Sequence, residues 1–181
     1  MHQGATPMSD CSVQDLTIRD AVVADVPALC ALRGARAPHE AKLAETAAGT
    51  ARFLVEVLGG DIVAFAGGRH RQPVTGPPKP HLPKLSDCFV APQYRSPGSS
   101  RALVSARERI AHAAGCELLS VSVDPIESPR WLDFFRGRGY RTLQPAPYRK
   151  GELRYADDGK SEEVLVWRQD LVVNPRKIEP A

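Results

Sequence analysis

The chain has 181 residues, of which 43% are hydrophobic and 25% charged, so we expect one globular domain with its own core. A formal net charge of +3, without any long run of lysine and arginine, argues against nucleic acid or a membrane as a partner. The four cysteines show no metal-ligand spacing and no segment has the pattern of a signal peptide or a spanning helix, so we expect a cytoplasmic protein without a metal site.

The N-terminal part of the chain predicts a tail, a strand and two helices. Residues 1–15 are polar and are expected to form a mobile tail, and the alternating residues 16–19 predict a first strand. Asp25 is placed to cap a helix from residue 26 to about residue 33. Residues 39–48, which are rich in alanine and glutamate, predict a second short helix.

The next part predicts a hairpin and a long loop. Residues 52–58 and 61–69 have the composition of strands, and Gly59-Gly60 joins them because both glycines tolerate the positive φ of a tight turn. Residues 72–84 contain five prolines and cannot lie inside a sheet, so we expect a loop there. A further strand is predicted at residues 85–90.

The second half of the chain predicts two helices with a strand between them. Residues 99–114 carry an apolar stripe at helical spacing and stop at Gly115, and residues 117–123 alternate as a strand does. Ser128-Pro129 opens another helix, with a capping residue followed by proline at the first helical position.

The C-terminal part predicts strands at residues 140–143 and 163–170, separated by a long polar loop at residues 144–162. The strand–helix–strand unit from residue 85 to residue 123 should be parallel with a right-handed crossover, and the outer hairpins antiparallel. These elements predict an α/β protein with a mixed sheet.

The loop Arg95–Ser100 stands between a predicted strand and a predicted helix. The first N–H groups of a helix have no partner in the helix, so this position suits a phosphate. With the residues before it the segment is Val-x-Pro-x-Tyr-Arg-x-x-Gly-x-Ser. This resembles the pyrophosphate loop of the GNAT superfamily of N-acetyltransferases, whose pattern is Arg/Gln-x-x-Gly-x-Gly/Ala. Other segments resemble the family too: Arg19-Asp20-Ala21 with Asp25-x-x-x-Leu29, Asp124 to Arg130 with Phe135 and Gly139-Tyr140, and Val164 to Trp167.

The resemblance covers roughly residues 16–171, which we expect to form one acetyltransferase domain between the tail 1–15 and a C-terminal tail, residues 172–181. It implies a GNAT-like fold: a central, mixed, mostly antiparallel sheet with a parallel, splayed strand pair, flanked by helices. It also implies acetyl-CoA as cofactor and transfer of the acetyl group to a primary amine by direct attack in a ternary complex.

The resemblance also implies a set of cofactor contacts. The backbone of Cys88, Phe89 and Val90 would pair with the pantetheine arm, and an N–H near Phe89 or Val90 would polarise the thioester carbonyl. Pro97 has no N–H and cannot hold the pyrophosphate. The residues expected to contact the cofactor are Cys88, Phe89, Val90, Arg95, Ser96, Gly98, Ser99, Ser100, Arg101, Ser128, Trp131 and Phe135.

Acetyl transfer to an amine requires a group that removes a proton from the ammonium. Asp87 is the first candidate for this base, because it lies on the strand beside the expected thioester, although a structural role in capping or pairing is also open. Glu56 and Glu127 are further candidates.

A second catalytic group is the acid that protonates the leaving thiolate. Phe135 stands where the family often has tyrosine and has no proton to give. The step would then be omitted, pass to water, or be carried out by Ser128, Tyr140 or Tyr148. The histidines are expected to be solvated or singly hydrogen-bonded.

Two alternatives to the acetyltransferase remain open. Pro97, Ser100 and Phe135 favour a CoA-binding module with weak or lost catalysis that acts in sensing or partner binding. An unrelated nucleotide-binding α/β protein would place its glycine-rich loop after the first strand, whereas this loop follows the fourth. The acceptor, a small-molecule or peptide amine, and the choice between monomer and homodimer are not determined by any sequence pattern.

Overall fold

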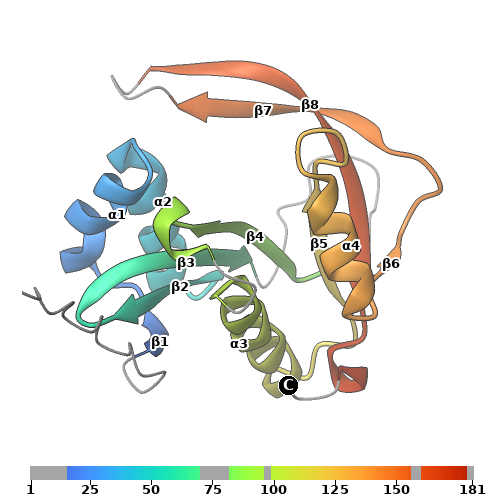
Figure 1. The fold of residues 1–181 in the computed structure, drawn as a ribbon, viewed down its shortest axis with the longest axis horizontal. Coiled ribbons are helices and arrows are strands. Elements are labelled where there is room, and N and C mark those ends of the chain that lie inside the picture. The colour runs from blue at the N-terminus through green and yellow to red at the C-terminus, as the bar shows by residue number, and fades with distance from the viewer. Residues whose placement is uncertain (1–15, 70–81, 96–98, 156–159, 179–181) are drawn as a thin grey trace, which may run out of the picture.

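The computed structural model describes residues 16–69, 82–95, 99–155 and 160–178 (Figure 1). Within these residues, eight strands form an open sheet, and four α-helices cover it. The strands are β1 Leu16–Asp20, β2 Ala51–Leu58, β3 Asp61–Arg69, β4 Lys84–Val90, β5 Leu119–Val123, β6 Arg141–Thr142, β7 Tyr148–Tyr155 and β8 Ser161–Val173. The helices are α1 Val26–Leu32, α2 Arg36–Ala47, α3 Ser99–Ala113 and α4 Pro129–Gly137.

The sheet has the order β1-β2-β3-β4-β5-β8-β6, with β7 paired to β8 off this path. Strands β1 to β4 are antiparallel neighbours, β4 and β5 are parallel, and β8 is antiparallel to β5, β6 and β7. This arrangement confirms the expected mixed, mostly antiparallel sheet. Within the described part of the chain, no helix is long and apolar enough to cross a membrane.

Helices pack on both faces of the first four strands. Alternate residues of β2 point to opposite faces, so Phe53 and Val55 join Leu29 of α1 in one core, while Leu54 joins Leu103 of α3 in another. A third core connects α3, α4, β5 and β8, and its buried members include Val104, Val121, Phe135, Tyr140 and Leu171. The sheet is therefore fixed from both sides beside β4 and β5.

The parallel pair β4–β5 is joined at one end only. Lys84 lies opposite Ser120 and Leu85 opposite Val121, and no further positions of the two strands are paired. From Ser86 onward, the edge of β4 that faces β5 has no strand neighbour among the described residues. This confirms the splayed pair that the sequence resemblance implies.

The hairpin β7–β8 corrects the expectation of a polar loop over residues 144–162. The β7 sequence, YRKGELRY, has no apolar alternation, yet all eight of its residues pair with β8. Charged cross-strand neighbours and the partner strand, rather than a buried face, hold β7 in place. Figure 1 shows the hairpin extending from the α4 side of the molecule towards the side of α1 and α2.

Strand β8 is also longer than predicted. It extends to Val173, and Val172 and Val173 lie opposite Ser120 and Leu119 of β5. The segment expected to be a tail from residue 172 onward therefore begins inside the sheet. Helix α2 begins at Arg36, three residues before the predicted start at His39. The predicted tail at residues 1–15 and most of the proline-rich loop lie outside the described residues.

Candidate functional site

A bulge in β4 shapes the site. Phe89 lies opposite Phe65 and Ser86 opposite Gly67, so Asp87 and Cys88 together face a single residue of β3. Asp87 has a φ of +48°, a left-handed conformation that aspartate tolerates better than most residues. Its side chain lies on the α2 side of the sheet, and Cys88 packs on the opposite side.

Two pockets open beside this bulge. The first, called here the basic pocket, is lined by Arg33, Cys88, Phe89, Val90, Arg95, Ser100, Ser128, Arg130, Trp131 and Phe134. The second, called the mixed pocket, lies between α1–α2, β4, β5, the start of α4 and the hairpin β7–β8. Its charged members are Arg33, Lys42, Asp87, Asp124, Glu127, Glu152, Arg154 and Arg168.

Among the described residues, the lining of the basic pocket contains three arginines and no acidic residue. The guanidinium carbons of Arg33 and Arg95 lie 5.4 and 5.8 Å from the ring centre of Phe89, which holds both cations near the bulge. Arg130 comes from the first turn of α4. An uncompensated positive field of this kind favours an anionic ligand.

The backbone of Val90 faces the gap between β4 and β5. Ala91 donates its N–H to the carbonyl of Val63 at 3.0 Å, so the backbone groups of the preceding residue point away from β3. The Val90 carbonyl accepts a hydrogen bond from Nε of Arg95 at 3.0 Å. The Val90 N–H points into the same gap and is available to a ligand that lies along β4.

Helix α4 supplies the wall shared by both pockets. Ser128 and Trp131 line the two of them. Ser128 is the N-cap residue of α4, and its side chain makes no capping hydrogen bond, so capping does not engage the hydroxyl. Phe135 is 2% exposed, stacks on Trp131 with ring centres 5.8 Å apart, and borders the mixed pocket rather than the basic one.

The predicted phosphate loop is only partly covered by the described residues. Ser96, Pro97 and Gly98 lie outside them, as does the side chain of Ser99. Ser100 lines the basic pocket. Arg101 is exposed and does not line either pocket, so its expected phosphate contact has no support in this geometry.

One wall of the mixed pocket brings Asp87 together with Lys42 and His39. Lys42 Nζ lies 2.9 Å from Oδ2 of Asp87. Partial desolvation acts to raise the pKa of Asp87, but the charges of Lys42 and Arg33 hold it below its ordinary value. Asp87 is therefore a stable carboxylate, better suited to hold an ammonium group than to keep a proton.

His39 is a site residue that the sequence reasoning missed. It is 2% exposed, packs against Phe53 and Phe65, and lines the mixed pocket. Burial, opposed by its bond to Arg33, lowers its pKa and favours the neutral ring. Nε2 lies 3.2 Å from the carbonyl oxygen of Arg33, whereas Nδ1 has no partner among the described residues. Only the position of α2 against β2 and β3 reveals this histidine, because a lone histidine in sequence has no recognisable pattern.

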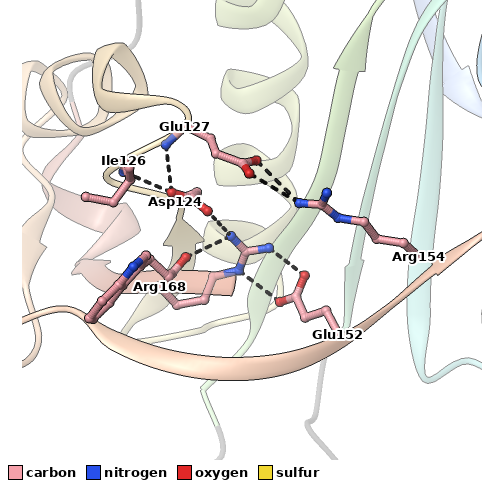
Figure 2. Close-up of polar contacts among 7 residues, drawn as sticks. Asp124, Ile126, Glu127, Glu152, Arg154 and Arg168 are labelled. Atoms are coloured by element: carbon pink, nitrogen blue, oxygen red, sulfur yellow. Dashed lines mark hydrogen bonds and ion pairs between the residues drawn. The ribbon is translucent and has the colours of Figure 1, made fainter. Parts of the chain in front are cut away.

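The opposite wall of the mixed pocket is organised by Arg168 (Figure 2). Its Nε and Nη2 donate to the two oxygens of Glu152, and its Nη1 lies 3.4 Å from Oδ2 of Asp124. Arg168 and Asp124 are 18% and 11% exposed, so this is a partly buried ion pair. It joins the hairpin β7–β8 to the turn between β5 and α4.

That turn leads directly to Ser128. Oδ1 of Asp124 accepts the N–H groups of Ile126 and Glu127 at 2.9 Å each, and the Asp124 carbonyl accepts the N–H of Ser128 at 3.1 Å. Glu127 also lies 3.4 Å from Arg154, in an exposed pair visible in Figure 2. The Asp124 side chain thus sets the turn from which α4 begins.

Tyr140, predicted to be catalytic, is located in the core instead. Its hydroxyl donates to Oε1 of Glu108 at 3.1 Å, and Arg138 binds the same carboxylate. Burial and the Glu108 charge raise its pKa. Tyr140 lines neither pocket, so the described geometry gives its expected catalytic role no support. Tyr148, the other tyrosine considered, donates to Oδ2 of Asp170 at 2.9 Å.

The two further candidates for the base, Glu56 and Glu127, differ in their location relative to the pockets. Glu127 borders the mixed pocket and is exposed. Glu56 is 1% exposed, shares the α3 side of the sheet with Leu54 and lines neither pocket. Burial raises its pKa to about 7, and its Oε2 has no partner among the described residues. The pKa of Glu56 suits a base, but its location does not.

Comparison with known proteins places this site in a family. The model of the "Acetyltransferase (GNAT) family" matches residues 26–140, more than half of the chain. The start of α1, the β4 bulge, α3 and α4 all lie in the matched part. None of the curated protein sequences matches the chain.

Solved structures share the fold at low sequence identity. An N-acetyltransferase from Staphylococcus aureus Mu50 is 13% identical, with a TM-score of 0.65 and coverage of 88% of this chain and 98% of that one. The ribosomal-protein-S18-alanine N-acetyltransferase from Escherichia coli is 16% identical, with a TM-score of 0.64 and coverage of 92% and 96%. The acetyltransferase yncA from Salmonella typhimurium, solved with acetyl-CoA, is 14% identical, with a TM-score of 0.65 and coverage of 90% and 95%.

Proposed function

The chain belongs to the GNAT acetyltransferase family, and from this premise we propose that it transfers an acetyl group from acetyl-CoA to a primary amine, by direct attack in a ternary complex. One observation carries the proposal. The basic pocket, with three arginines and no acid, opens onto the free edge of β4. An anionic cofactor with an extended, amide-containing arm fits these two features together.

We assign the cofactor to the basic pocket. Arg95, Arg130 and the start of α3 near Ser100 would hold its phosphates, and the arm would lie along Cys88, Phe89 and Val90. The thioester supplies an activated acetyl group. The N–H of Val90, which points into the gap, would donate to the carbonyl oxygen as negative charge develops there.

The acceptor amine belongs in the mixed pocket. A water held at Asp87 takes one proton from the ammonium group and passes it to solvent, and the free amine forms a bond to the carbonyl carbon. The carbon–sulfur bond then breaks, and the proton that the new amide nitrogen gives up replaces the one donated to the leaving sulfur. Ser128 lies at the boundary of both pockets and is the described hydroxyl best located to give a proton to the leaving sulfur. We therefore propose Asp87 and Ser128 as the catalytic residues, and we propose no catalytic role for Tyr140.

Binding and turnover are tested separately. Titration with acetyl-CoA, CoA and NAD, followed by thermal shift, tests the ligand: stabilisation by both CoA species and not by NAD is expected. Release of thiol from acetyl-CoA across an amine panel tests the reaction. The panel should include a peptide with N-terminal alanine, because the name of the similar E. coli enzyme specifies such an acceptor. Failure of CoA species to stabilise the protein would overturn the proposal.

A CoA-binding module without turnover is the second candidate. Two residues favour it. Phe135 is buried and its side chain has no polar atom, and the hydroxyl of Tyr140 donates its hydrogen bond to Glu108. Stabilisation by CoA with no amine-dependent thiol release would support this alternative.

A further inference from the structure

We propose that the acceptor is amino-acid-like, with an anionic group a few bonds from its reacting amine, so that Asp87 receives the ammonium and Arg33 the anion. This inference rests on the proposed function, because it names the substrate class of the mixed pocket. It follows from which charged side chains of that pocket already form ion pairs with other side chains and which do not.

The hairpin wall neutralises its own charges (Figure 2). Both oxygens of Glu152 accept hydrogen bonds from Arg168. Of the two Asp124 oxygens, one faces Arg168 and the other accepts the N–H groups of Ile126 and Glu127. An ammonium group that approached this wall would have to displace an arginine or break the turn before α4, which is unfavourable for a partly buried pair.

On the opposite wall of the mixed pocket, the Asp87 carboxylate can still accept a hydrogen bond from a ligand. Lys42 engages Oδ2 of Asp87, and within the described part of the chain nothing is bonded to Oδ1. The Asp87 side chain is 48% exposed, so the free oxygen is accessible to an ammonium group. A hydrogen bond between these two charged groups is among the stronger polar contacts in proteins.

Arg33 is the cation of the mixed pocket without an acidic partner among the described residues. Its backbone carbonyl is held by His39, which fixes the turn between α1 and α2, and its guanidinium lies over Phe89. Its charge contributes, after Lys42, to the low pKa of Asp87, so the two side chains are near one another. A free carboxylate oxygen and an unpaired guanidinium on one wall match an acceptor of both signs.

Other acceptors fit less well. A polyamine needs a second free carboxylate for its distal ammonium, and those of the hairpin wall are bound to arginine. A simple alkylamine would desolvate Arg33 and leave it without a partner, which costs binding free energy. A compound with both charges satisfies Asp87 and Arg33 together.

The test uses sets of matched amines. Each common α-amino acid is compared with its carboxamide and with the amine that lacks the carboxyl group, and diaminopentane and an alanine peptide amide are added. Thiol release is measured and expressed per unprotonated amine, because the carboxamides have lower amine pKa values. For at least one set we expect the carboxylated member to exceed its carboxamide by on the order of 10-fold in kcat/KM. If turnover is absent, calorimetric binding to the CoA complex measures the same preference.

Variants then assign the preference to Arg33. In Arg33→Gln the preference should collapse and the acceptor KM should rise about 10-fold. Because Arg33 also lines the basic pocket, the preference is measured at saturating acetyl-CoA, where a change in the acetyl-CoA dissociation constant does not affect it, and its loss is expected there too. Arg33→Lys should restore part of the preference. Arg36→Gln is the matched control: this exposed arginine, three residues along, pairs with Glu40 and lines neither pocket, so no change is expected.

Three outcomes would overturn the inference. One is a wild-type preference for the carboxamide, the diamine or the peptide amide. Another is an Arg33→Gln variant with weakened acetyl-CoA binding and an intact preference, which would assign Arg33 to the cofactor. The third is equal activity or binding within every matched set. All three differ from failure of the proposed function, in which neither CoA binding nor thiol release is observed with the wild type.

Discussion

The basic pocket and the mixed pocket share a boundary at Arg33, Cys88, Ser128 and Trp131 but use charge in opposite ways. The lining of the basic pocket contains three cations and no anion. The mixed pocket has four of each, and most of them form ion pairs. Unpaired charge attracts a ligand, whereas paired charge fixes the shape of a wall. Under the proposed function, this difference separates recognition of an anionic cofactor from discrimination among acceptors.

The largest effect is expected from a change at Asp87, whose carboxylate has one oxygen bound to Lys42 and, among the described residues, one without a partner. Asp87→Asn keeps the shape and the tolerance of positive φ but removes the charge. We expect kcat/KM for the acceptor to fall on the order of 10²-fold, with acetyl-CoA affinity unchanged, measured by steady-state kinetics and calorimetry. A variant that lost both functions equally would show that the bulge, not the charge, matters.

The pH profile adds to this test. Because the folded pKa of Asp87 is lowered from 3.8, its carboxylate stays ionised throughout the neutral range. The decline in kcat/KM on acidification from about pH 8 to about pH 5 should then come from protonation of the amine. Asp87→Asn should lower the whole profile without changing its shape.

The second effect breaks the basic pocket. Arg130→Gln removes a cation that lines this pocket alone, so we expect the acetyl-CoA dissociation constant to rise about 10-fold. The acceptor KM should remain constant. Arg136→Gln on the same helix, exposed and outside both pockets, serves as the control. Equal weakening by the two substitutions would mean that long-range charge, rather than the pocket, attracts the cofactor.

The third effect tests whether the ion pairs of Arg168 stabilise the wall of the mixed pocket. Arg168→Gln leaves Glu152 and Asp124 without their partner, so we expect the free energy of unfolding to fall by about 2 kcal/mol and the acceptor KM to rise a few-fold. Denaturant unfolding and kinetics measure the two. Arg154→Gln, which breaks an exposed pair, should change stability by less than about 0.5 kcal/mol. Similar losses of unfolding free energy in both variants would contradict the distinction between the partly buried pairs of Arg168 and the exposed pair of Arg154.

The smallest effect on turnover concerns Glu56, which lies outside both pockets. Glu56→Gln should leave kcat/KM unchanged. Its folded pKa is about 7 against 4.5 in the unfolded chain, so the folded state retains a proton that the unfolded state loses. Wild-type stability should therefore fall by about 3 kcal/mol as pH rises through this window, and the variant should lack that decline. A large loss of activity in the variant would make Glu56 the base after all.

Several elements could be predicted because their signals are local. Gly59 and Gly60 both have positive φ in the β2–β3 turn, and α4 begins at Pro129 directly after Ser128. Turn chemistry and capping act between residues a few positions apart, so one sequence suffices to identify them. The family resemblance adds the splayed strand pair.

Other features could not be predicted because they depend on distant partners. The β7 sequence is mostly polar and lacks apolar alternation, and its strand exists through pairing with β8 and the Arg168–Glu152 contact. The bulge at Asp87 arises from the register between β3 and β4. Tyr140 was expected at the site because its sequence context matched, but Glu108 and Arg138 hold it in the core.

By itself, the sequence determined the family, the mixed α/β sheet and the strand β4 that borders both pockets, because hydrophobic period, turn residues and loop spacing are local properties of the chain. The tertiary structure alone decided which charges remain free within the described residues: there, Asp87 has one unbound oxygen and Arg33 has no acidic partner, whereas Asp124 and Glu152 are already bound to Arg168. Charge pairing is a property of groups brought together from separate elements, and a linear pattern of acidic and basic residues does not record it.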